Sequence, residues 1–109
     1  MADALPGPLA AKLEELACQH AGLAAELEDP ATLADHNAVR ELSIKKAALE
    51  QVVTGYRAYS GLLEEAAELR EALASGDDAE LAEMAREEIP RLEAEAAARI
   101  EAVKAALVQ

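Results

Sequence analysis

Side chains that could bind a metal ion or act as a nucleophile are few in this chain. Its two histidines, His20 and His36, have no other histidine or cysteine at the spacing of metal ligands. Cys18 lies two residues before His20, and residues two apart do not share a helix face, so a thiolate–base pair is not expected. We expect Cys18 to be a small buried apolar residue. The sequence therefore predicts no metal site and no bound cofactor.

Carboxylates and tyrosines are the other candidates for chemistry. Neighbouring glutamates occur at Glu14–Glu15, Glu64–Glu65 and Glu87–Glu88, but on helices they would project into solvent without a concave site around them. Tyr56 and Tyr59 could stack on a nucleobase, yet they fall on an apolar helix seam, where we expect them to pack with their hydroxyl groups reaching water. The chain has no glycine-rich phosphate loop, no serine elbow and no basic cluster. We predict that it is not an enzyme and takes no small-molecule substrate.

The composition is typical of a helical protein that does not enter a membrane. The 109 residues are 52% hydrophobic, and two tyrosines are the only aromatic residues. The formal net charge of -12 repels phosphate backbones and anionic lipid heads, so a partner should be a protein or be locally basic. No leader pattern and no apolar run of about 18 residues occurs. The charge and the lack of such a run predict no membrane partner. Cys18 has no second cysteine to pair with, so we expect the reducing cytoplasm as the compartment.

Apolar spacing predicts a first helix over about 8–27. Leucines recur there in steps of three and four, and His20 fills the one missing position of the seam. Thr32 and Asp35 match a capping box, in which a hydroxyl and a carboxylate three residues later satisfy free backbone donors. A second helix should therefore begin near Asp35.

The second helix is expected to be long, over about 35–74. Its seam is apolar except at Lys45 and Arg70. Gly55 and Gly61 lie inside it, and each costs up to about 1 kcal/mol relative to alanine, which indicates a bend or a close approach of helices near the tyrosines.

A third helix is expected over about 78–108, after the break at 75–78. Gly76 can end one helix in a left-handed conformation, and either aspartate after it can cap the next. Pro90 lies inside the third helix, where it removes a backbone hydrogen bond, so we predict a kink near Pro90. Three ion pairs four residues apart are expected on helix surfaces: Glu41 with Lys45, Glu87 with Arg91, and Glu95 with Arg99.

These lengths predict an all-α fold, an antiparallel three-helix bundle in a single domain over residues 1–109. The first helix can cover only the first half of the second, because it is much shorter. The rest of the second helix and the start of the third should then project as a two-helix hairpin. The tip of this hairpin is expected at residues 74–78.

Several short stretches of this sequence resemble segments of one protein family, and they occur in the same order along the chain. They are Leu13–Leu16 leading to Leu27–Pro30, Ala34–Asp35 with Arg40–Ser43, Leu49–Val53 with Tyr56 and Tyr59, and Asp78–Ala85 followed by Glu87–Ile89. Together they resemble the N-terminal domain of the bacterial class I peptide chain release factors, the translation-termination proteins that read stop codons. The segment after Asp78 resembles the type reading UAA and UAG more closely than the type reading UAA and UGA. Lys45 and Lys46 depart from the family, which often has an aromatic and acidic patch there.

The resemblance implies a domain without catalytic activity. Members of this family continue into a domain with a Gly-Gly-Gln motif, which promotes peptidyl-tRNA hydrolysis, and into another with a tripeptide that reads the stop codon. Both are absent from this sequence, so we expect the chain to be excised from a longer protein. The family's N-terminal domain reaches toward the base of the ribosomal stalk, near the stalk-base protein and its RNA, and faces the GTPase release factor. These are the partners that the resemblance implies.

The hairpin tip is the candidate contact surface, because it lies at the end opposite the C-terminus, which would lead to the body of such a factor. The candidate residues are Leu73, Ser75, Asp77, Asp78 and Leu81. The alternative is that the serine and the aspartates only cap helices, although capping and contact can coexist. A different class of function also fits the helical pattern, namely a free-standing coiled-coil adaptor that binds protein partners through a helix face. A Gly-Gly-Gln motif downstream in the gene would separate the two functions.

Overall fold

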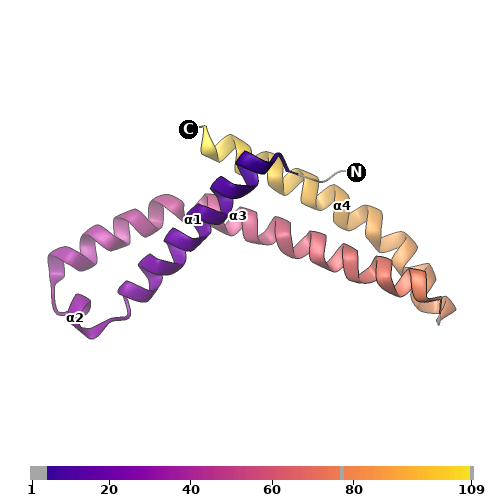
Figure 1. Ribbon diagram of the computed structural model, residues 1–109, viewed down its shortest axis with the longest axis horizontal. Coiled ribbons are helices and arrows are strands. Elements are labelled where there is room, and N and C mark those ends of the chain that lie inside the picture. Colours follow the sequence, from indigo (N-terminus) through magenta and orange to yellow (C-terminus); the bar gives the residue numbers. More distant parts are fainter. Residues whose placement is uncertain (1–4, 77, 109) are drawn as a thin grey trace. The chain divides into compact units, whose positions relative to one another are not determined.

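The computed structural model describes residues 5–76 and 78–108, and four helices contain most of them. They are α1 (Gly7–Glu26), α2 (Pro30–Leu33), α3 (His36–Ser75) and α4 (Ala79–Leu107), shown in Figure 1. No strand occurs in residues 5–76 or 78–108, so the all-α fold class is confirmed. Three of these helices are long, and the short helix α2 is additional to those expected from the sequence.

The turn between α1 and α3 differs from the sequence prediction. Asp29 caps α2, and Pro30 occupies its first position, where the missing N–H of proline would be unpaired in any helix. Asp35 then caps α3, because its carboxylate accepts hydrogen bonds from two backbone amides in the first turn of that helix. The predicted capping box was therefore wrong. Thr32 lies inside α2, and Asp35 is itself the cap.

The molecule divides into two compact units, one ending at Thr54 and the other beginning at Gly55. We call them the α1 unit and the α4 unit. The first part of α3 belongs to the α1 unit and the second part to the α4 unit. The three-helix bundle with a projecting hairpin stays a prediction, and so does the single domain over residues 1–109.

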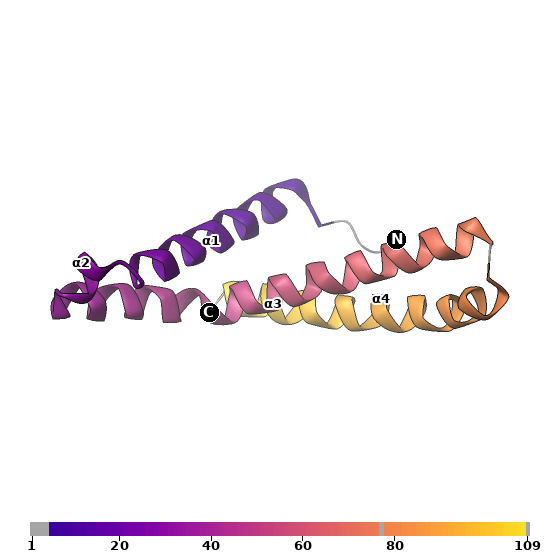
Figure 2. The same cartoon turned by 90° about the horizontal axis from the view of Figure 1, so that it is seen from below.

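In the α1 unit, α1 returns beside the first part of α3, and α2 lies in the turn between them (Figures 1 and 2). The buried side chains occupy the expected seams: Leu13, Leu16 and His20 on α1, and Val52 and Val53 on α3. Cys18 is exposed, so the expectation that it is buried was wrong. It lies two residues after Leu16, and that spacing turns it to the opposite side of the helix.

In the α4 unit, the second part of α3 and α4 run side by side (Figures 1 and 2). Tyr56 and Tyr59 are buried, as expected from their positions on the seam, and the contact of their hydroxyl groups with water stays a prediction. The other buried positions are small or branched residues: Ala66 on α3, and Ala82, Ala85, Ile89, Leu92, Ala96, Ile100 and Val103 on α4. The α4 seam begins at Ala82, whereas Leu81, its expected first member, is 36% exposed.

Two residues of α3 are unusual for their positions, a glycine inside the helix and an arginine in its apolar seam, and contacts with α4 explain both. A Cβ atom added at Gly55 would lie 2.7 Å from Cγ2 of Val103, so glycine permits a close approach of the two helices at this point. Arg70, the charged residue in the apolar seam, forms an ion pair with Glu93 of α4. Both residues therefore serve the packing of the α4 unit.

The connection from α3 to α4 follows the expected chemistry. Gly76 has a φ of 67°, the left-handed conformation that ends a helix, and Asp78 caps α4. The helix α4 then continues through Pro90 to Leu107. The kink near Pro90 stays a prediction.

The surface ion pairs are only partly those expected. Arg99 lies 3.6 Å from Glu95, as expected, whereas Arg91 pairs with Glu88, one residue away from the expected Glu87. Lys45 forms no ion pair with any residue in the described ranges. None of the helices, over the residues that the structure describes, is both long and apolar enough to cross a membrane.

Candidate functional site

The residues expected at the hairpin tip lie where α3 ends and α4 begins. Leu73 is half-buried, and the Ser75 hydroxyl donates a hydrogen bond to the carbonyl of Ala72 at 2.9 Å. The carboxylate of Asp78 accepts hydrogen bonds from the amides of Glu80 at 3.0 Å and Leu81 at 3.3 Å. Asp77 lies outside the described residues. The serine and the described aspartate thus make the capping contacts, and a role of the tip in partner contact stays a prediction.

Met84 is a further exposed residue of this region that the sequence reasoning missed. It is 43% exposed and lies three residues after Leu81, so the two side chains share one face of α4. The sequence signal was available in the spacing of Leu81 and Met84. It was overlooked because Leu81 was assigned to the buried seam.

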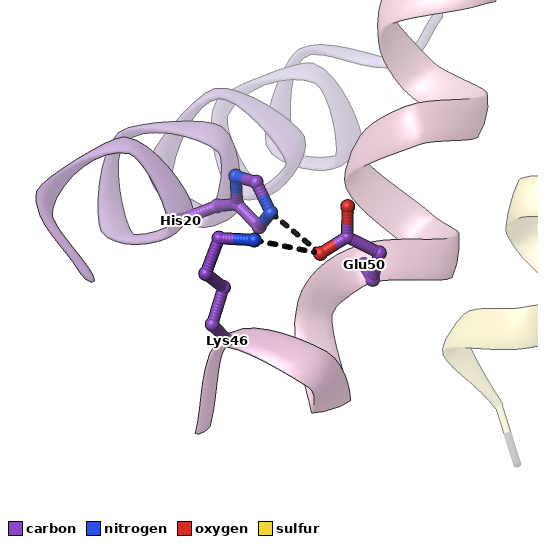
Figure 3. Close-up of polar contacts among 3 residues, drawn as sticks. All are labelled: His20, Lys46 and Glu50. Atoms are coloured by element: carbon purple, nitrogen blue, oxygen red, sulfur yellow. Dashed lines mark hydrogen bonds and ion pairs between the residues drawn. The ribbon is translucent and has the colours of Figure 1, made fainter. Parts of the chain in front are cut away.

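A polar cluster in the α1 unit joins α1 to α3. Figure 3 shows the His20 ring and the Lys46 ammonium group pointing toward the carboxylate of Glu50. Nε2 of His20 lies 3.0 Å from Oε1 of Glu50, and Nζ of Lys46 lies 3.3 Å from the same oxygen. A carboxylate can only accept, so Nε2 of His20 carries the hydrogen and donates it. The cluster therefore ties the middle of α1 to α3 through one oxygen atom.

The environment of this cluster is strongly asymmetric. The His20 side chain is 9% exposed and the Glu50 side chain 51% exposed. Nδ1 of His20 is buried and has no hydrogen-bond partner within the described ranges. The hydrogen bonds from His20 and Lys46 hold the pKa of the Glu50 carboxyl below its usual range. With Nε2 bonded to Glu50 and Nδ1 buried, His20 makes a structural contact between α1 and α3.

An open groove lies beside this cluster, also within the α1 unit. Its volume is about 450 Å³. Its walls are formed by α1 and the first part of α3, and its lining residues are Gln19, Gly22, Leu23, Glu26, Lys45, Ala48 and Leu49. Sequence reasoning did not find this groove, because it depends on which faces of the two helices are left uncovered when they pack.

The described residues contain no group of three or more histidine, cysteine or acidic side chains that could hold a metal ion. His36 lies at the first position of α3 and is exposed, and Cys18 is exposed on α1. The described part of the tip holds helix-capping contacts, and the α1 unit has an open groove between α1 and the first part of α3.

Comparison with known proteins gives the family context of these surfaces. The family model of the PCRF domain matches residues 16–109. Peptide chain release factor 1 of Magnetococcus marinus is 45% identical over 78 residues, which are 71% of this chain and 22% of that protein. The protein of the same name from Pelobacter propionicus is 42% identical over 84 residues, which are 77% of this chain and 23% of that protein.

A third relative, peptide chain release factor 1 of Anaeromyxobacter dehalogenans, is 38% identical over 81 residues, which are 74% of this chain and 22% of that protein. The chain thus spans less than a quarter of the length of these relatives. No solved structure gives a significant match to it.

Proposed function

Because the chain belongs to the family of PCRF domains, we propose that it is the non-catalytic N-terminal domain of a class I peptide chain release factor that acts in translation termination. The observation that carries this proposal is the family match over residues 16–109, which includes most of α1 and all of α2, α3 and α4. The names of the relatives, all peptide chain release factor 1, support it.

We propose further that the parent factor is of the type that reads UAA and UAG. The segment Asp78–Ala85, which begins at the cap of α4, resembles that type, and it includes the exposed Leu81 and Met84. The direct test is to read the gene beyond the codon for Gln109. A Gly-Gly-Gln motif and a stop-codon-reading tripeptide in the downstream sequence are expected. Their absence would favour the free-standing adaptor instead.

The role proposed for the domain is to position the factor in the cytoplasm, on the ribosome near the stalk base and the GTPase release factor. Long helices suit this role, because each residue of a helix adds about 1.5 Å of length. The proposed contact residues are those of the tip, namely Leu73, Ser75, Asp77, Asp78 and Leu81. In the described part of the tip, Asp78 and Leu81 are exposed residues.

The test of the tip removes charge while it keeps the cap. In the full-length factor, Asp77→Asn with Asp78→Asn deletes two charges, and asparagine caps a helix about as well as aspartate. The matched control is Glu64→Gln with Glu65→Gln, which deletes two exposed charges from α3. Ribosome binding and recycling that depends on the GTPase factor are then measured.

Impaired binding or recycling in the tip variant, with unchanged helicity and a normal control, would support the contact. Unchanged binding and recycling would leave Asp78 as a structural cap and exclude the tip charges from the mechanism. Peptide release in the assembled termination reaction reports separately on whether the parent protein is a release factor at all.

A further inference from the structure

The open groove of the α1 unit has no role in the proposed contact at the tip. We infer that it is a docking site for an amphipathic helix of another protein. That helix would place leucine-like side chains over the groove floor and both a basic and an acidic side chain at the groove rim. This inference goes beyond the proposed function, and it would hold for the domain whatever the parent protein does.

The first argument is the apolar floor. Leu23 of α1 and Leu49 of α3 are only half-buried, although both belong to the seams that face the core. Ala48 is exposed beside them, and Ile44, one turn before it on α3, is 63% exposed. The apolar surface thus continues out of the groove along α3. A helix lying on two others presents side chains at every third or fourth position, and a volume of about 450 Å³ holds several of them.

The second argument is Gly22, which lines the groove from the C-terminal part of α1. Glycine inside a helix is less stable than alanine by up to about 1 kcal/mol. At Gly55 the packing within this chain explains why a glycine is present, because Val103 occupies the space that a Cβ would need. A Cβ at Gly22 would meet nothing within 4 Å in the described structure. A missing side chain in the lining of a groove allows the backbone of a docked helix to approach closely.

The third argument is charge. Glu26 on the α1 wall and Lys45 on the α3 wall both line the groove, and neither has an ion-pair partner among residues 5–76 and 78–108. Lys46, the neighbour of Lys45, is paired with Glu50. A docked helix that carries a lysine or arginine opposite Glu26 and a carboxylate opposite Lys45 would satisfy both. A second copy of this chain is a poor occupant, because its net charge of -12 repels a like copy.

The experiment uses the 109-residue chain and a displayed library of helical peptides. Leucines are fixed at every third and fourth position, and the flanking positions vary among lysine, glutamate and serine. Two variants are compared with the wild type. Gly22→Leu places a large side chain in the groove. Gly61→Leu makes the same change at another helical glycine, where an added Cβ also meets no described atom within 4 Å. Circular dichroism checks that both variants keep their helicity.

We expect enriched peptides with both a lysine and a glutamate flank. Gly22→Leu should weaken their binding by at least about tenfold, while Gly61→Leu should leave it unchanged. The largest changes in amide chemical shift should occur at Gly22 and Ala48. Lys45→Glu should weaken binding of a selected peptide, and replacing the peptide's glutamate by lysine should restore it, because the pair is then reversed and not removed.

Three results would overturn the inference. The first is that no peptide is enriched, and the second is that Gly22→Leu binds the enriched peptides as well as the wild type does. The third is self-association of the wild type, measured by sedimentation, that Gly22→Leu abolishes, since a second copy would then be the occupant. Enrichment without any preference for charged flanks would overturn the stated chemistry of the partner.

Discussion

His20 is a buried polar residue in a seam otherwise made of apolar side chains. Its burial is tolerated because Nε2 donates to a carboxylate, and burying a polar group without a partner is costly. Nδ1 still lacks a described partner. The sequence placed His20 on the seam correctly from its spacing. It did not identify Glu50 as the partner, because the two residues lie in different helices and only the packing of α1 on α3 brings them together.

The Glu50 carboxyl should make stability depend on pH. The hydrogen bonds from His20 and Lys46 lower the pKa of the Glu50 carboxyl in the folded chain. The ionised carboxylate therefore stabilises the fold at pH values above the pKa that this group has in the unfolded chain. The stabilisation is lost as the pH falls through the lower pKa of the folded chain. We expect Glu50→Gln to destabilise the protein near pH 6 and to have little effect near pH 2. Urea unfolding at both pH values, monitored by circular dichroism, measures the difference.

The control for this prediction is Glu64→Gln, which removes an exposed carboxylate from the same helix. It should not reproduce the pattern of Glu50→Gln. A loss of stability from Glu50→Gln that is equal at both pH values would show that the carboxylate charge is not responsible.

Substitution by alanine should change the stability of the protein in opposite directions at Gly55 and Gly61. At Gly61 the new Cβ meets no described atom within 4 Å, so Gly61→Ala should stabilise by about 0.5–1 kcal/mol through helix propensity. At Gly55 the Cβ would overlap Val103, a stiff β-branched side chain that is 2% exposed. Overpacking of this kind costs about 1–3 kcal/mol, which should exceed the gain in propensity. Thermal unfolding of the two variants measures both signs.

The control is a double-mutant cycle with Val103→Ala, which removes the overlapping methyl groups. In that background Gly55→Ala should be less harmful, or even stabilising, because the two changes are coupled. An equal cost of Gly55→Ala in both backgrounds would contradict the close approach of α3 and α4 at this point.

At the scale of the elements, the ends of the helices depend on a few side chains. Asp29, Asp35 and Asp78 each stand immediately before a helix and accept hydrogen bonds from its first amides. The end of α3 just before Gly76 and the cap of α4 could be predicted, because glycine and aspartate have strong local preferences at these positions. The helix α2 could not, because Asp29 and Pro30 fit both the end of one helix and the start of another.

The cap of α4 gives a prediction at this scale. Asp78→Ala leaves the amides of Glu80 and Leu81 without their acceptor and should destabilise by about 1 kcal/mol. Asp78→Asn keeps an acceptor oxygen and should be nearly neutral. Urea unfolding of both variants tests this. An equal loss from Asn and Ala would mean that charge, and not the hydrogen bonds, accounts for the role of Asp78.

For the molecule as a whole, the excess of acidic residues is the dominant electrostatic property. The chain has twenty-two acidic residues and ten basic ones. Repulsion among the excess negative charges destabilises compact states. We expect the melting temperature to rise with sodium chloride, because salt screens interactions between exposed charges beyond about 10 Å at 0.1 M. Thermal unfolding at low and high salt measures the effect.

A triple variant provides the control. Glu64→Gln, Glu68→Gln and Glu71→Gln remove three exposed carboxylates spaced three and four residues apart on α3, where like charges destabilise by about 0.2–0.5 kcal/mol per pair. The variant should melt at a higher temperature than the wild type in low salt and should show a smaller rise with added salt. A melting temperature of the wild type that falls with salt would show that the favourable ion pairs outweigh the repulsion.

The sequence by itself determined the all-helical fold, because helix formation depends on signals within a few neighbouring residues. These signals are the apolar spacing, as at Leu13 and Leu16 or at Ile89 and Leu92, and the glycine that ends a helix. It also carried the family resemblance. Only the tertiary structure decided three contacts: the hydrogen bond of His20 with Glu50, the ion pair of Arg70 with Glu93, and the close packing of Val103 on Gly55. Each contact joins residues far apart in the chain. The groove beside Gly22 belongs to the same class. A periodic pattern shows which side of each helix is apolar, but the width of that side left uncovered depends on how two helices pack.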